Sequence, residues 1–185
     1  MFPDIANVLM LRDALWRRRG LGNASVMVGA GFSRNADPVG VSAGAMPTWT
    51  EMAQALCRPL YPSEPDRLEA ALREANGTSG FLRLAQEYRT AFGQSALYDR
   101  IRAMTPDAGY RPGNLHRRLL GLPWSDVFST NWDTLLERAR DDVFHRRYDV
   151  IRTSDEIAYS QRPRIVKLHG SFPAHHPNRS APCRC

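Results

Sequence analysis

Lysine is almost absent from this chain. Lys167 is the single lysine among 25 basic residues, so arginines carry nearly all of the positive charge behind the formal net charge of +6. The arginines are scattered, and their one run, Arg17-Arg18-Arg19, stands at the end of a predicted helix, where cations suit the helix dipole. Because no stretch concentrates this charge on one face, the sequence does not indicate a nucleic-acid partner.

Cysteines and long apolar runs are also scarce. The three cysteines, Cys57, Cys183 and Cys185, are odd in number and lack C-x₂-C spacing, so they predict neither a disulfide framework nor a structural metal site. No apolar run approaches the roughly 20 residues of a membrane helix, and the N-terminus lacks a signal-peptide pattern. We therefore expect a cytoplasmic protein with no bound metal and no membrane partner.

Two phosphate-binding fingerprints are missing as well. Gly29 and Gly31 begin a G-x-G-x-x-G pattern, but Arg34 takes the place of its third glycine. The acidic residue expected about 20 positions later would fall near Glu51, inside a predicted helix. A G-x-x-x-x-G-K-[ST] loop is excluded by the position of the single lysine. The sequence therefore disfavours an ordinary hydride-transferring dehydrogenase.

The chain does contain many apolar residues at helical spacing. At 185 residues and 43% hydrophobic residues, it fits one globular domain with a substantial core. Stripes between residues 49 and 104 predict several helices, and a shorter helix is expected over 114–120. We interpret about 50–120 as a helical insertion within the same domain. A first helix is predicted with one core-facing side, formed by Ile5, Val8, Leu11 and Leu15.

Four short apolar segments predict strands, at residues 25–28, 126–130, 148–151 and 165–168. Small or polar residues follow three of them, as is typical of an open parallel sheet in the α/β class. Ligands of such sheets bind at the carboxyl ends of the strands, so the segments after these strands are predicted to share one crevice. Gly29 and Gly31 let a ligand approach the backbone, although glycines after a strand also serve simply to turn the chain.

Three segments carry a family resemblance. V-G-A-G-F-S at 28–33, S-T-N-W-D at 129–133 and K-L-H-G-S at 167–171 resemble the signature segments of the sirtuin fold, in that family's order. Protein-deacetylating sirtuins carry an I-P-[DE]-F-R type segment and four zinc-binding cysteines. Here Met46-Pro47-Thr48-Trp49 replaces the first, and the cysteine tetrad is missing. Both departures resemble the sirtuin-like domains of bacterial anti-phage defence systems, which hydrolyse NAD.

The resemblance implies a Rossmann-like NAD-binding domain over residues 1–172 in which Asn131 and His169 are catalytic. An amide such as that of Asn131 can orient the ribose hydroxyls or water, and a histidine such as His169 can take a proton near neutral pH. By its position, Asp133 is expected to cap the following helix. The resemblance also implies a homo-oligomer or a partner sensor module. The NAD-binding residues that it implies are Gly29, Ala30, Gly31, Phe32, Ser33, Thr130 and Asp133.

Alternatives follow from the end of the chain and from single residues. The family's domain continues past the His-Gly motif with further strands, so we expect a truncated domain, with residues 173–185 as a disordered or out-of-frame tail. The short C-terminus keeps an inactive nucleotide-binding remnant open. An NAD-dependent protein deacylase stays open as a separate alternative. Taken alone, Asn131 could also be a helix cap. The other histidines are expected at the surface: His116, His145, His175 and His176.

Overall fold

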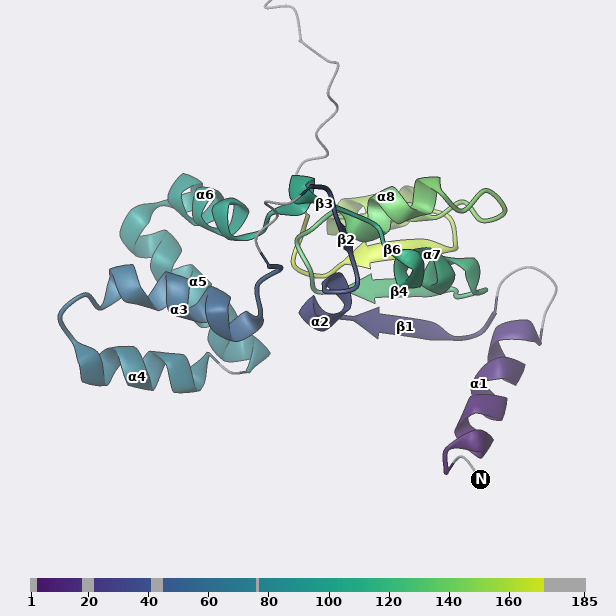
Figure 1. Cartoon of the computed structure of the whole chain (residues 1–185), viewed down its shortest axis with the longest axis horizontal. Coiled ribbons are helices and arrows are strands. Elements are labelled where there is room, and N and C mark those ends of the chain that lie inside the picture. Colours follow the sequence, from purple (N-terminus) through teal and green to yellow (C-terminus); the bar gives the residue numbers. More distant parts are fainter. Residues whose placement is uncertain (1–2, 18–21, 41–44, 76, 172–185) are drawn as a thin grey trace, which may run out of the picture.

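The computed structural model describes residues 3–17, 22–40, 45–75 and 77–171, which form a parallel sheet with its flanking elements and a separate group of helices (Figure 1). All the pairings in the sheet are parallel. Its four strands lie in the spatial order β1 (Ser25–Val28), β4 (Asp126–Ser129), β6 (Arg164–Lys167) and β5 (Asp149–Ile151).

Shorter elements surround this sheet. Helices α7 and α8 lie together along it in Figure 1, and their buried residues Leu120 and Leu136 belong to the same core as Val127 and Ile165 of the central strands. A two-stranded antiparallel ribbon, β2 with β3, lies at one side. The elements are α1 (Ile5–Trp16), α2 (Ala30–Ser33), β2 (Asp37–Pro38), η1 (Asp107–Gly109), β3 (Tyr110–Arg111), α7 (Asn114–Gly121), α8 (Leu135–Asp141) and η2 (Ser154–Tyr159).

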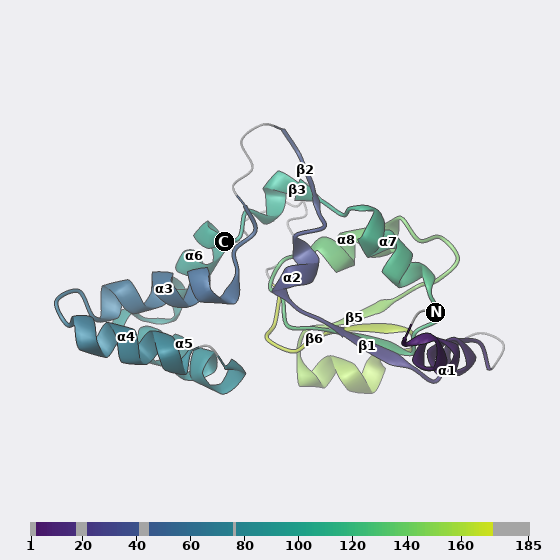
Figure 2. The same cartoon turned by 60° about the horizontal axis from the view of Figure 1, so that its bottom comes forward.

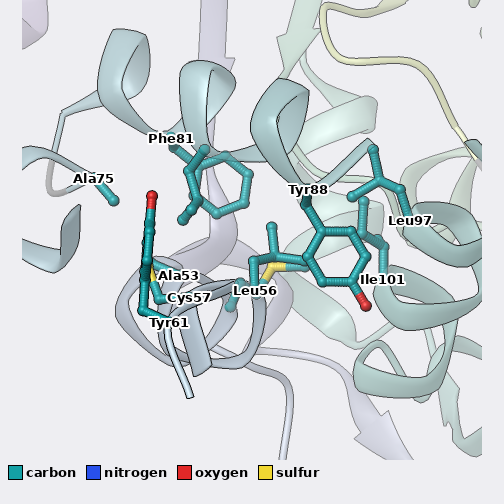
Figure 3. Close-up of a cluster of buried hydrophobic side chains, with 11 residues drawn as sticks. Ala53, Leu56, Cys57, Tyr61, Ala75, Phe81, Tyr88, Leu97 and Ile101 are labelled. Atoms are coloured by element: carbon teal, nitrogen blue, oxygen red, sulfur yellow. The ribbon is translucent and has the colours of Figure 1, made fainter. Parts of the chain in front are cut away.

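Four helices between β1 and β4 form the second part of the molecule, with a core of their own. They are α3 (Trp49–Leu60), α4 (Pro65–Glu74), α5 (Thr78–Phe92) and α6 (Gln94–Met104). Figure 3 shows this core, in which Leu56 and Phe81 are almost fully buried. Figure 2 shows the four helices beside the sheet, next to α2. Because α7 shares the sheet core, the separate helical core ends with α6.

The start of α3 is set by local sequence. The Thr48 side chain accepts a hydrogen bond from the Glu51 amide at 3.2 Å, while the Thr48 amide donates to the Glu51 carboxylate at 2.6 Å. This reciprocal capping box satisfies two donors at the helix start. The hydrogen bonds that the Thr48 amide and hydroxyl donate to the Glu51 carboxylate hold its pKa below its usual range. Glu51 therefore belongs to the capping box of α3 and does not stand at a strand end, where a ribose-binding acid is expected.

The structure corrects two expectations about burial. The C-terminal turn of α1 is attached to the segment before β1, where the Ala14 carbonyl accepts from the Asn23 amide at 2.9 Å and the neighbouring Gly22 amide donates to the Pro123 carbonyl at 2.8 Å. Leu15 is therefore buried, whereas the other residues of the predicted core-facing side are exposed: Ile5, Val8 and Leu11. Strand β1, predicted as buried, lies at an edge of the sheet, so Val28 is buried but Met27 is 63% exposed.

The predicted α/β class and parallel sheet are confirmed, in a Rossmann-like arrangement. Each of the four predicted strands is present to within about one residue at its ends. Among the described residues, no helix has both the length and the apolar character to cross a membrane. The predictions for the tail at 173–185, with Cys183, Cys185, His175 and His176, lie outside the described residues.

Candidate functional site at the carboxyl ends of the strands

The sheet register brings the three predicted segments to one edge of the sheet. Val28 pairs with Ser129, and Ser129 pairs with Lys167, so β1, β4 and β6 end side by side. The residues that follow these strands are therefore neighbours in space. Gly29, after β1, and Asn131, after β4, are 102 positions apart in the chain. All three strands point toward the helical part in Figure 1.

Asn131 lies at the centre of a buried hydrogen-bond network. Its amide nitrogen donates to the Gly29 carbonyl at 2.9 Å and to the Ser33 hydroxyl at 2.7 Å. The Ser33 hydroxyl donates in turn to Asp133 Oδ2 at 2.6 Å. Both amide hydrogens of Asn131 are thus used, while its buried Oδ1 has no hydrogen-bond partner among the described residues. The network fixes the orientation of this acceptor.

Asp133 accepts hydrogen bonds in two directions. Its Oδ1 accepts from the Leu135 amide at 3.2 Å, which is the helix-capping role predicted from its position. Its Oδ2 accepts a hydrogen bond from Ser33, so the start of α8 is also connected to α2, which follows β1. Asp107 completes the start of α8, because its carboxylate accepts from the Thr134 amide at 2.9 Å and the Thr134 hydroxyl at 2.7 Å. Asp107 was not among the predicted site residues, because the sequence around it indicates only a turn.

His169 is packed among aromatic rings from both parts of the molecule. Its ring centroid lies 5.8 Å from that of Trp49 and 6.2 Å from that of Trp132. The indole nitrogen of Trp132 donates to the His169 carbonyl at 2.8 Å. His169 Nδ1 is buried and has no hydrogen-bond partner among the described residues. Helix α8 begins at Leu135, so Trp132 lies before the helix and anchors the His169 segment.

A small cavity of about 30 Å³ lies between this network and the start of the helical part. It is large enough for one or two water molecules. His169, Gly29, Gly31 and Phe32 do not line it, and the Phe32 ring packs edge-on against His116 with centroids 4.8 Å apart. The lining residues are Ala30, Ser33, Met46, Pro47, Trp49, Met52, Thr105, Thr130, Asn131, Trp132 and Asp133.

A side chain at position 31 would point into open space. A Cβ built at this position would meet no heavy atom within 4 Å, and at Gly29 it would meet only the Thr130 hydroxyl, at 3.5 Å. The backbone of Gly29 is extended and Gly31 lies within α2, conformations that other residues adopt. Neither local backbone shape nor packing among the described residues therefore requires glycine at position 31.

His116 was predicted to lie at the surface, and that prediction is wrong. Its side chain is 1% exposed. On the first turn of α7 the ring turns back, so that Nδ1 accepts a hydrogen bond from the Gly113 amide at 3.2 Å. Burial lowers the pKa of His116, because the charged imidazolium would lose its hydration. His145, by contrast, is exposed as predicted.

The burial of His116 predicts a loss of stability in weak acid. Because its pKa is lowered in the folded state, the unfolded chain binds more protons below the usual value of about 6.5. The free energy of unfolding should therefore fall as the pH decreases from about 7.5 to about 5, and less steeply for His116→Gln. Urea unfolding at both pH values measures this. The exposed-site control His145→Gln should keep the wild-type dependence, and an equal flattening in both variants would contradict the prediction.

Together these observations define an α/β protein of Rossmann-like arrangement, with a small cavity at the carboxyl ends of its parallel strands. Neither a protein-family model nor a curated protein matches this chain. Within the part of the chain that the structure describes, no group of three His, Cys, Asp or Glu side chains is placed to hold a metal ion.

Proposed function

We propose that this chain is a sirtuin-like NAD hydrolase that cleaves the bond between nicotinamide and ribose. The observation that carries the proposal is the Asn131 Oδ1 atom, which is buried at the cavity without a partner among the described residues. An unsatisfied buried acceptor costs on the order of 1–3 kcal/mol, so a donor is expected to occupy this place. A water molecule or a ribose hydroxyl is such a donor, and either would be oriented by Asn131.

The proposed reaction needs little acid catalysis. The bond from ribose C1′ to the nicotinamide nitrogen breaks, and its electron pair leaves with neutral nicotinamide. A water molecule attacks C1′ of the oxocarbenium-like sugar and gives its proton to His169. The free Nδ1 atom of His169 supports this assignment, as does the Trp132 hydrogen bond that holds the residue in place. The products are nicotinamide and ADP-ribose.

Binding of NAD requires the cavity to enlarge. Sites for ligands of drug size or larger measure roughly 300–1,000 Å³, about ten times the cavity in this structure or more. We propose that the wall formed by Met46, Pro47 and Trp49 moves away from Asn131 when the dinucleotide enters. The wall belongs to the start of the helical part, which meets the His169 segment through ring contacts of Trp49. Closure of this wall would then exclude water other than the reacting molecule.

Nicotinamide release tests the proposal. Purified chain is incubated with NAD, with and without an acylated peptide, and nicotinamide is measured by chromatography. Release without peptide is expected, and His169→Ala should lower its rate by about 10²–10⁴-fold, whereas the exposed-site control His145→Ala should not. Release that requires the peptide would favour a deacylase. Binding of NAD without release would favour an inactive nucleotide-binding module.

The resemblance also supports assembly of this chain with itself or with a sensor module. Activity of an oligomer depends on protein concentration, because dissociation removes the active form. The release assay is therefore run over a range of chain concentrations, with the oligomeric state measured by light scattering at each. A specific activity that does not change while the oligomeric state changes would contradict the proposed role of self-assembly.

A further inference from the structure

The single lysine of the chain is buried beneath the proposed site. The Lys167 side chain is 1% exposed, and its Nζ donates to the Asp133 carbonyl at 2.6 Å. The same Nζ lies 3.4 Å from the carboxylate of Glu137, whose side chain is 7% exposed. Lys167 is the last residue of β6, which precedes His169, and Glu137 lies on α8, which follows Asn131. This ion pair therefore joins the two elements next to the proposed catalytic residues.

Glu137 also holds the other end of the His169 segment. The Ser171 hydroxyl donates to Glu137 Oε1 at 2.8 Å. The segment 168–171 is therefore attached before His169 by Lys167, at His169 by the Trp132 indole, and after it by Ser171. All three attachments reach the β4–α8 segment or α8 itself.

Stability alone does not explain this arrangement. Replacing a buried ion pair with apolar residues of similar size is often neutral or stabilising, because the two charges lose their hydration on folding. An apolar pair would fill the space, but it could not donate to the Asp133 carbonyl or accept from Ser171. What the charged pair adds is the relative placement of two backbone segments that carry polar site residues.

We propose that Lys167 and Glu137 are positioning residues that hold the His169 segment in register with the Asn131 segment. Both side chains are buried and bonded to protein groups, so neither is expected to touch the ligand. The role in catalysis rests on the proposed NAD hydrolysis, since small displacements of a reacting group cost about 10²-fold in rate. The attachment itself is a property of the structure and can be measured without substrate.

The test is the double variant Lys167→Met/Glu137→Leu, which removes both charges together. Hydrogen exchange is followed at two amides, Gly170, which donates to the Lys167 carbonyl within the segment, and Leu168, which donates to Ser129 of β4. Gly170 should exchange about tenfold faster than in the wild type, while Leu168 changes little. The matched control is the exposed ion pair of α4, as Glu69→Leu/Arg73→Met, which should leave both amides unchanged.

Kinetics supply the second measurement. In the double variant kcat for nicotinamide release should fall about 100-fold with KM nearly unchanged. The single variant Glu137→Gln keeps an acceptor for Ser171, so its kcat should lie between those of the double variant and the wild type. Unchanged exchange at Gly170, or equal acceleration at both amides, would overturn the positioning role. A wild-type chain that releases no nicotinamide while Gly170 alone is accelerated would overturn the proposed function and leave the positioning role supported.

Discussion

Asn131→Ala is expected to lower the rate of NAD cleavage by about 10²–10³-fold, because it removes an oriented acceptor, without a partner among the described residues, from a residue that lines the cavity. The substitution also removes the donor to the Gly29 carbonyl and the Ser33 hydroxyl. It should therefore reduce the free energy of unfolding by about 1–3 kcal/mol. Nicotinamide release is measured at a temperature where circular dichroism shows both proteins to be folded.

A neighbouring asparagine is the matched control for this variant. Asn35 donates its amide to the Phe32 carbonyl at 2.9 Å from an exposed position, and it does not line the cavity. Asn35→Ala should keep wild-type turnover. If Asn131→Ala and Asn35→Ala have the same turnover as the wild type, Asn131 has only a structural role, and the catalytic assignment is wrong.

Gly31→Ala is expected to separate folding from ligand binding. The added Cβ meets no described atom within 4 Å, and within helix α2 alanine is favoured over glycine by about 0.5–1 kcal/mol. Stability should therefore be equal or slightly higher. If the NAD diphosphate rests on this turn, the methyl group costs about 1–3 kcal/mol of binding, which is about 5–150-fold in affinity for NAD. Thermal unfolding and equilibrium NAD binding measure the two effects.

Gly121→Ala controls for the effect of a methyl group in a helix. Gly121 lies in α7, and a Cβ built there also meets nothing within 4 Å. This variant should bind NAD like the wild type. Equal affinity for NAD in Gly31→Ala and Gly121→Ala would show that the ligand does not approach position 31.

The division of the molecule into two cores has a consequence for the proposed reaction. The helices α3 to α6 pack mainly with each other, and Trp132 from the sheet part packs against their core. The rings of Trp49 and Trp132 lie 5.7 Å apart, so the two parts meet next to His169. A movement that admits a dinucleotide would therefore also change the surroundings of the proposed base. If the proposed function holds, NAD binding and the arrangement of His169 should therefore be coupled.

Much of the local structure could be predicted from the sequence. Strand β4, which ends at Ser129, follows from a short apolar run, and the helix start at Thr48 follows from capping chemistry. Both act between residues a few positions apart. The parallel sheet followed from several such strands with helical stripes between them. The grouping of the segments after β1, β4 and β6 followed from the general rule for parallel sheets.

Three features could not be predicted, because each depends on packing between distant segments. The burial of His116 depends on how α7 is packed against the rest of the sheet part, including Phe32 of α2. The exposure of α1 depends on where its last turn joins the sheet, since apolar residues occur on all its sides. The position of Lys167 depends on Glu137, which lies 30 residues away in the chain.

By itself, the sequence determined the class of fold, the location of most helices and strands, and the set of polar residues at the ends of parallel strands. These depend on side-chain periodicity, turn residues and helix caps, which act within one or two turns of the chain. Only the tertiary structure decided that Asn131 Oδ1 has no partner among the described residues while the amide nitrogen donates to Ser33, and that the cavity beside it is small. Hydrogen bonds between residues 98 positions apart exist only after the sheet has brought them together.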